Sequence, residues 1–179
     1  MILIVEYMVR YFERALYLFV FPFLFLCSCI QEETSTEDVV VIGSKLPDFT
    51  VVMNDGRIVT GALLRETVAV VMFFHTCCPD CQQVLPHVQL LYDEYAQQGV
   101  TFTLISREES DESIETYWSD AGLMMPYSAQ KDRKVYELFA YSRVPRIYIC
   151  GIGGTVQYVF TDNPVPTYES LKMALDELL

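Results

Sequence analysis

Residues 68–81 read VAVVMFFHTCCPDC and join an apolar run to a pair of cysteines. The apolar run is unbroken and rich in β-branched side chains, which is typical of a central strand buried on both faces. Cys78 and Cys81 follow it, and Pro79 between them suits the first turn of a helix. The stretch therefore predicts a buried strand, a short loop and a helix, with a Cys-x-x-Cys pair at the junction.

This position is expected to give the two cysteines different roles in thiol chemistry. A thiol at the start of a helix faces backbone N–H groups without helical partners, and these favour its thiolate. Cys78 could then attack a disulfide of a partner, and Cys81, one turn further along, could resolve the mixed disulfide. A structural disulfide would not need the strand-to-helix position. A zinc site would need more ligands. Only Cys77, Cys150 and two histidines are available, and none of them forms a second closely spaced pair. We expect neither a metal nor a cofactor.

The pattern on either side of the motif alternates between strand and helix. Expected strands and helices are a hairpin over 50–53 and 58–60, a strand over 68–74, a helix over 79–97, a strand over 100–106, helices over 110–121 and 133–141, a hairpin over 146–150 and 155–160, and a helix from Thr167. A βαβ unit followed by a ββα unit is the thioredoxin arrangement. The expected class is α/β, a central mixed sheet flanked by helices, with an N-terminal hairpin and an extra central helix.

Val144-Pro145 stands directly before the strand expected over 146–150. Proline is tolerated at the first position of a strand, and a cis X-Pro bond in a tight turn is usually a specific feature. In the thioredoxin arrangement this turn faces the Cys-x-x-Cys pair, where the backbone of Val144 would pair with an extended substrate. A trans proline that only starts the strand fits the sequence equally well.

The N-terminal part has the pattern of an export signal. Arginines at positions 10 and 14 precede an apolar stretch over 15–26, which is shorter than the roughly 20 residues of a comfortable membrane span. Residues 26–29, Leu-Cys-Ser-Cys, are similar to the lipobox of bacterial lipoproteins, which implies a lipid on Cys29. We therefore expect a lipoprotein signal peptide over 1–28.

A polar, acidic stretch follows the lipobox. Residues 29–42 are expected to form the lipidated cysteine and a flexible tether, and residues 43–179 the folded domain. The whole chain has 179 residues and a formal net charge of -12, which suits one domain and argues against a nucleic-acid partner. Its six cysteines would otherwise suggest the three disulfides of a secreted scaffold.

Residues 43–179 resemble the thiol–disulfide oxidoreductases of the thioredoxin superfamily, of the membrane-tethered TlpA/ResA type. The features that match are Gly43 with Pro47-Asp48-Phe49, the strand and motif over 68–81, Pro86 in the motif helix, the helix after Ser106, and Val144-Pro145. The resemblance implies an exposed nucleophile at Cys78, a buried resolving Cys81 and a cis Pro145. It also implies work on protein disulfides or dithiols in the bacterial cell envelope, facing the periplasm or the surface. A reductase is favoured, with a thiol-reducing electron donor in the membrane.

Three positions depart from that pattern. Cys77 stands where the family usually has tryptophan, Val84 where many members have a glutamate that assists proton transfer, and Met72 where classical thioredoxins bury an aspartate. The acid that would manage the proton of the resolving cysteine is therefore missing from both places. Asp80 or His75 could replace it, since histidine titrates near neutrality, but an ordinary loop residue is the favoured interpretation of His75, because spacing alone cannot place its ring.

For three other residues a structural role is favoured over a chemical one. We expect Cys77 to be a small buried hydrophobe rather than a second reactive thiol, and Cys150 to be inert core. Arg146 could add positive potential near the thiolate, but a solvated arginine at a strand end is favoured.

Two rival functions use the same fold. Copper delivery would use Cys77 and Cys81, because soft thiolates suit Cu(I), but the proteins that do this need a histidine far downstream and none follows His87. A peroxiredoxin-like peroxidase would need threonine three residues before its reactive cysteine and a proline further upstream, where His75 and Val71 stand. The thiol–disulfide oxidoreductase is therefore favoured.

Overall fold

The computed structural model of the chain describes residues 38–179. The signal peptide expected over 1–28, the lipid on Cys29 and the tether as far as residue 37 lie outside the described residues. No helix within 38–179 has the length and apolar character needed to cross a membrane.

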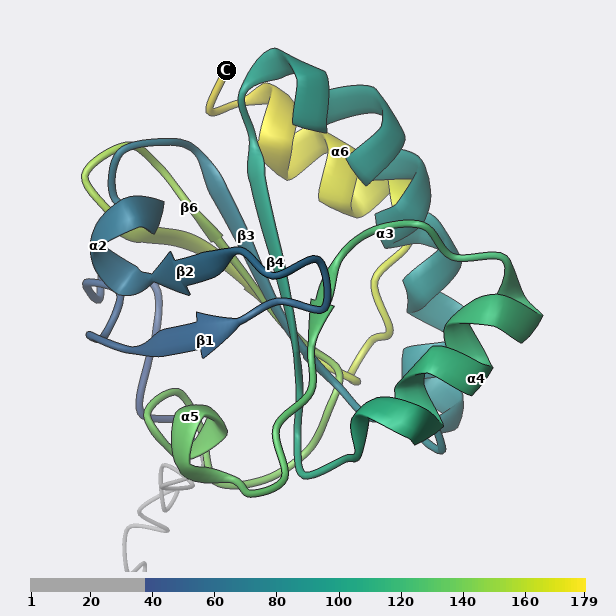
Figure 1. Ribbon diagram of the computed structural model, residues 1–179. Helices are drawn as coiled ribbons and strands as arrows, with labels where there is room; N and C mark the ends of the chain where they lie inside the picture. The colour runs from purple at the N-terminus through teal and green to yellow at the C-terminus, as the bar shows by residue number, and fades with distance from the viewer. Residues whose placement is uncertain (1–37) are drawn as a thin grey trace, which may run out of the picture. The chain divides into compact units, whose positions relative to one another are not determined.

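A mixed five-stranded sheet lies at the centre of the described part, in the spatial order β5–β4–β3–β6–β7 (Figure 1). Its strands are β3 (Ala69–Phe74), β4 (Thr101–Ser106), β5 (Tyr127–Ser128), β6 (Arg146–Cys150) and β7 (Val156–Phe160). β4 runs parallel to β3 and β5, whereas β6 runs antiparallel to β3 and β7. β3 is central and buried along its whole length, as its apolar sequence predicts.

Helices cover both faces of this sheet. One side carries α3 (Pro79–Tyr95), α4 (Asp111–Ala121) and α6 (Tyr168–Asp176), and the other carries α2 (Gly61–Leu64), α5 (Lys134–Glu137) and the hairpin of β1 (Thr50–Val52) and β2 (Ile58–Thr60) (Figure 1). A 3-10 turn, η2 (Ala96–Gln98), continues α3 and ends at Gly99, whose φ of 94° lies in the left-handed region. The hydroxyls of Ser110 and Thr167 accept backbone N–H groups and cap α4 and α6, as expected.

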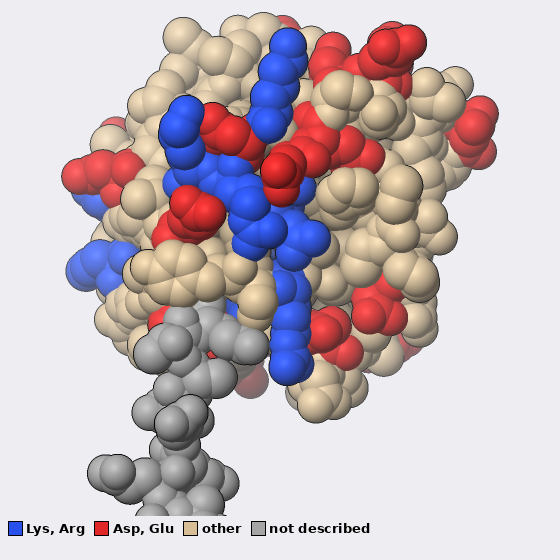
Figure 2. Space-filling model, turned by 90° about the horizontal axis from the view of Figure 1, so that it is seen from below, with Lys and Arg blue, Asp and Glu red and all other residues tan. Residues whose placement is uncertain are grey.

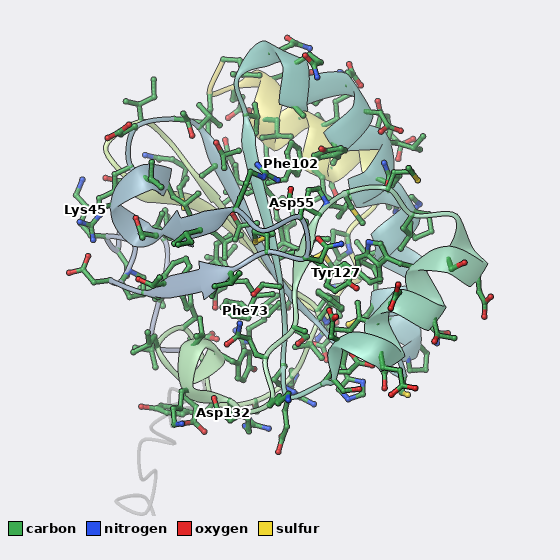
Figure 3. The ribbon with its side chains drawn as sticks, viewed as in Figure 1. Lys45, Asp55, Phe73, Phe102, Tyr127 and Asp132 are labelled. Atoms are coloured by element: carbon green, nitrogen blue, oxygen red, sulfur yellow. The ribbon has the colours of Figure 1, made fainter. Side chains whose placement is uncertain are left out.

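The last two residues of β3 anchor the core on opposite faces of the sheet. Phe73, labelled in Figure 3, packs against Tyr136 and Phe139 with ring centroids 5.3 and 4.8 Å away. Phe74 packs against Trp118 of α4 at 5.0 Å. Neighbouring side chains of a strand point to opposite faces, so both sides of β3 are filled at the point where the cysteine motif begins.

The expected α/β class is confirmed, including the N-terminal hairpin and the extra central helix α4. The sequence does not predict α2 or β5, which have only four and two residues. The helix expected over 133–141 ends earlier, at Glu137. A backbone carbonyl just beyond it, that of Phe139, instead accepts the N–H groups of Val39 and Val40 at 3.0 and 2.9 Å.

These contacts change the expected start of the folded domain. Residues 38–42 were expected to belong to the tether, but Val40 is only 4% exposed and Asp38 forms a β-bridge with Ala140. The Asp38 carboxylate also forms an ion pair with Arg146. The folded part therefore includes residue 38, ahead of the boundary expected at residue 43.

The expectation that Arg146 is solvated is wrong. Its side chain is only 2% exposed. Burial is possible because the guanidinium pairs with Asp38 and Nε donates to the backbone oxygen of Ser142 at 3.0 Å. The N-terminal segment that supplies Asp38 lies 108 positions away in the sequence, so local pattern could not indicate this pair.

Candidate active site

Cys78 and Cys81 lie where β3 leads into α3. Cys78 is the N-cap residue of α3, with an extended backbone, and Pro79 occupies the first turn, where a missing N–H costs no hydrogen bond. No side chain caps α3, so the first N–H groups of the helix are free to face the Cys78 sulfur or solvent. Cys81 follows within the first turn.

The two thiols differ in their access to solvent. Cys78 is partly exposed, whereas Cys81 is fully buried. Burial raises the pKa of the Cys81 thiol far above its ordinary value. A partner disulfide can therefore reach Cys78 directly, and Cys81 is placed to react with a sulfur that Cys78 has already captured.

The loop before β6 completes this side of the motif. The Val144–Pro145 peptide bond is cis, and both residues are buried. The Cys78 thiol donates a hydrogen bond to the carbonyl oxygen of Val144 at 3.3 Å. The proline turn and the Cys-x-x-Cys pair are thus adjacent, as the thioredoxin arrangement implies. A second cis bond, Asn163–Pro164, precedes α6 and was not anticipated.

Glu109 is a buried carboxylate at the motif that sequence reasoning missed. It is only 7% exposed and accepts the backbone N–H of Thr76 at 3.0 Å, while the Thr76 hydroxyl donates to its other oxygen. The sequence held one usable signal, because Glu109 follows β4 closely. The C-terminal ends of parallel neighbours meet at one edge of a sheet, so residues just after β4 lie near those just after β3.

Within the described residues, no contact joins the ring of His75 to the sulfur of Cys78 or Cys81. Its Nδ1 accepts the backbone N–H of Cys77 at 3.1 Å. The proton of the neutral ring is then on Nε2, and the 3.9 Å separation of Nδ1 from Glu109 is not a hydrogen bond. The backbone N–H of His75, rather than its ring, is what interacts with the Cys81 thiol. Asp80 lies half-buried in the first turn of α3.

The geometry agrees with the comparisons to known proteins. A family model described as the AhpC/TSA family matches residues 42–159. The chain belongs to the AhpC/TSA family. It is a thioredoxin-like thiol–disulfide oxidoreductase, and its curated relatives include the thiol-disulfide oxidoreductase ResA of Bacillus thuringiensis, 24% identical over 64% of this chain and 66% of the relative. The match to this relative thus covers about two thirds of its length.

Solved structures show the same fold as this AhpC/TSA protein. A candidate protein disulfide isomerase from Bacteroides thetaiotaomicron superposes with a TM-score of 0.75 at 21% identity, covering 82% of this chain and 94% of that one. The thioredoxin domain of a thiol-disulfide oxidoreductase from Bacteroides vulgatus gives 0.67 at 17% identity, covering 78% and 99%. These likenesses establish the thioredoxin-like fold.

The expectation that Cys77 is buried in this AhpC/TSA protein is wrong. Cys77 is exposed, because the tight turn from His75 to Cys78, closed by a 3.0 Å backbone hydrogen bond, leaves its side chain facing solvent. Cys150 is buried and pairs with Ala69 at the opposite end of β3 from the motif, and burial raises its pKa to about 12. Among residues 38–179, no group of three or more His, Cys, Asp or Glu side chains could hold a metal ion.

Apolar side chains occupy the two positions at which the resemblance would place a glutamate or an aspartate. Val84 on α3 and Met72 on β3 are both fully buried in the core. Neither can exchange a proton, so Glu109 is the buried carboxylate that the described structure brings to the motif loop.

Removal of Glu109 should loosen this loop. Glu109→Ala leaves the buried N–H and hydroxyl of Thr76 without their partner, which we expect to lower the free energy of unfolding by about 1–3 kcal/mol. Urea unfolding of both variants measures the change. The matched control is Glu115→Ala, an exposed glutamate on α4, for which we expect a change within about 0.5 kcal/mol. Equal losses in the two variants would contradict the assigned role.

Proposed function

We propose that this chain reduces disulfides of protein substrates outside the cytoplasm, through Cys78 as nucleophile and Cys81 as resolving thiol. The observation that carries the proposal is the asymmetry of the pair. One thiol is accessible and contacts the cis-proline loop, and the other is buried one helical turn behind it. A structural disulfide would require neither feature.

The proposed reaction is two successive thiol–disulfide exchanges. The Cys78 thiolate attacks one sulfur of the substrate disulfide, a new S–S bond forms, and the other substrate sulfur leaves as a thiolate. Cys81 then loses its proton and attacks the Cys78 sulfur, which releases the second substrate thiolate. The substrate gains two electrons and two protons, and the protein is left with a Cys78–Cys81 disulfide. A dithiol donor, proposed to lie in the membrane, must return this disulfide to thiols.

The Val144–Pro145 loop is the proposed substrate-binding element. It is next to the reactive thiol, and its backbone is the kind of surface on which an extended chain can form main-chain hydrogen bonds. Within the motif, Pro79 starts the helix and Asp80 adds a carboxylate to its first turn. We propose that Glu109 orders the loop, and that His75 or Asp80 exchanges the proton with solvent.

The proposed location follows from the N-terminal sequence. The signal peptide over 1–28 and the lipid on Cys29 would fix the chain to the cell envelope of a bacterium, facing the periplasm or the outside. A location in an oxidising compartment suits a protein that exchanges disulfides with other proteins.

Insulin reduction tests the proposed activity. With a small dithiol as donor, the purified chain should accelerate the cleavage of the insulin interchain disulfides, and equilibration with a glutathione buffer should give a reduction potential close to the roughly −270 mV of thioredoxin. A value near the roughly −120 mV of strong oxidants would overturn the proposed direction. Hydrogen peroxide offered in place of insulin tests the peroxidase alternative, and a Cu(I) titration of Cys77→Ser tests copper delivery.

A further inference from the structure

Arg107 is a charged side chain that this chemistry leaves without a role. It directly follows β4, and its backbone N–H donates to the carbonyl oxygen of Phe74, at the end of β3, at 2.8 Å. Its guanidinium carbon lies 5.7 Å from the centre of the Tyr136 ring. Nε is buried and has no hydrogen-bond partner within residues 38–179. Buried donors are nearly always paired, so this nitrogen needs an explanation.

The contacts of Arg107 lead to the thiols from two directions. On one side, Phe74 is followed by His75, whose backbone N–H interacts with Cys81. On the other side, the Tyr136 hydroxyl donates to the backbone oxygen of Arg143 at 2.6 Å, and Arg143 precedes the Val144 carbonyl that accepts the Cys78 thiol. The Arg107 guanidinium therefore lies between the two loops that flank the pair, and its charge opposes the rise that burial imposes on the pKa of Cys81.

The backbone on both sides is held in an uncommon conformation. Glu108, next to Arg107, has a φ of 69°, and Arg143 has a φ of 67°. A residue other than glycine in the left-handed region persists only where its surroundings fix it, and such residues gather at functional sites. Glu109 and Gln130 hold the first loop, because the Glu109 N–H donates to the Gln130 oxygen at 2.7 Å.

We propose that Arg107 is a positioning residue for the second exchange, which places a fixed positive charge beside the thiol pair and promotes the attack of Cys81 on the mixed disulfide. The inference rests on the proposed function and adds a role that the sequence did not suggest. In this step Cys81 gives its proton to solvent, its sulfur bonds to the Cys78 sulfur, and the bond from Cys78 to the substrate breaks. The electron pair of that bond leaves on the substrate sulfur as a thiolate.

Asp80, between the two cysteines in the first turn of α3, adds a carboxylate beside the pair, and the other charged groups near it are already engaged or are neutral. Figure 2, which shows the molecule from below, has Lys and Arg side chains in a band with acidic side chains beside and between them. Arg133 also lies over Tyr136, at 5.3 Å, but its Nε pairs with Glu137 at 3.6 Å, and Arg146 pairs with Asp38. The remaining groups that face the thiols are Tyr117 of α4, neutral because burial raises its pKa, and His75 with Glu109 at the Thr76 end.

A rapid-mixing experiment with dithiodipyridine, a neutral aromatic disulfide, separates the two exchanges. In the full chain carrying Cys77→Ser, attack by Cys78 releases the first thiopyridone, and resolution by Cys81 releases the second. The second phase should accelerate with rising pH, because it needs the Cys81 thiolate and burial raises the pKa of that thiol. Arg107→Gln should slow this phase about tenfold near neutral pH and move its pH profile upward by about one unit.

Control variants show whether an effect on the second phase comes from the charge of Arg107. Arg133→Gln removes the other guanidinium that contacts Tyr136 and should leave the second phase within about twofold of the parent chain. Arg107→Lys keeps the charge and should recover most of the rate. If Arg107→Gln does not fold, Arg107→Met, which keeps a long unbranched side chain without the charge, replaces it. Equal second-phase profiles in the Arg107 and Arg133 variants would overturn the inference. Absence of the first phase from the parent chain would instead overturn the proposed function.

Discussion

Cys78→Ala is expected to abolish the reduction of insulin by this chain, with a loss of about a thousandfold or more. Thiolates are the attacking groups in thiol–disulfide exchange, and Cys78 is the partly exposed thiol of the pair. Cys81 cannot replace it, because its side chain is fully buried and a protein disulfide cannot reach it. The measurement is the initial rate of insulin reduction at equal protein concentration.

Cys77 makes the control for this variant essential. It is exposed and next to Cys78, so it could support a slow residual reaction when Cys78 is absent. Cys77→Ser alone should keep most of the activity, because it is the Cys78 thiol that contacts Val144 of the cis-proline loop. The double variant of Cys77→Ser and Cys78→Ala should lose even the residual rate. If Cys78→Ala keeps more than about a tenth of the parent activity in the Cys77→Ser background, Cys78 is not the nucleophile.

Cys81→Ser is expected to hold partner proteins as mixed disulfides. The first exchange proceeds through Cys78, but a serine hydroxyl does not attack the captured sulfur, so the adduct should persist at least about a hundredfold longer than in the parent chain. Non-reducing gels of a cell-envelope extract should show adducts that a reductant removes, and mass spectrometry identifies the partners. The same spectra show whether Cys29 carries a lipid.

A matched variant distinguishes trapping from a general effect of losing a buried thiol. Cys150 is as buried as Cys81, but it lies at the far end of β3 from the motif. Cys150→Ser should therefore remove a buried thiol without trapping any partner. Adducts of equal abundance in both variants, or none in Cys81→Ser, would contradict the resolving role of Cys81.

The strand, the motif and the helix that follows could be predicted because each has a local cause. The apolar run of β3 is buried as expected, and the hydroxyls of Ser110 and Thr167 begin their helices at the predicted positions. Such signals depend on neighbours in the sequence. The contact of Cys78 with Val144 was expected only because the thioredoxin arrangement brings the two loops together.

Two of the residues that sequence reasoning misjudged, Arg146 and Glu109, depend on distant partners, and the third, Cys77, depends on a local turn. Arg146 is buried because Asp38 reaches it from the N-terminal segment, and Glu109 enters the site because Thr76 supplies two donors. Cys77 is exposed because of the turn geometry between His75 and Cys78, which a composition argument cannot supply. A charged side chain can be buried where another segment supplies a partner for it. The pattern of neighbouring residues in the sequence does not reveal such a partner.

The ion pair of Asp38 with Arg146 would also limit where a lipid-anchored form of this protein can work. Arg146 lies two positions after Val144, so the described chain begins at the same end of the sheet as the reactive thiol. If Cys29 carries the lipid, as proposed, only nine positions (38 minus 29) separate the anchor from that end, a reach of roughly 30 Å when fully extended. The thiols would then serve partners within a shallow layer above the bilayer and would be out of reach of those deeper in the compartment.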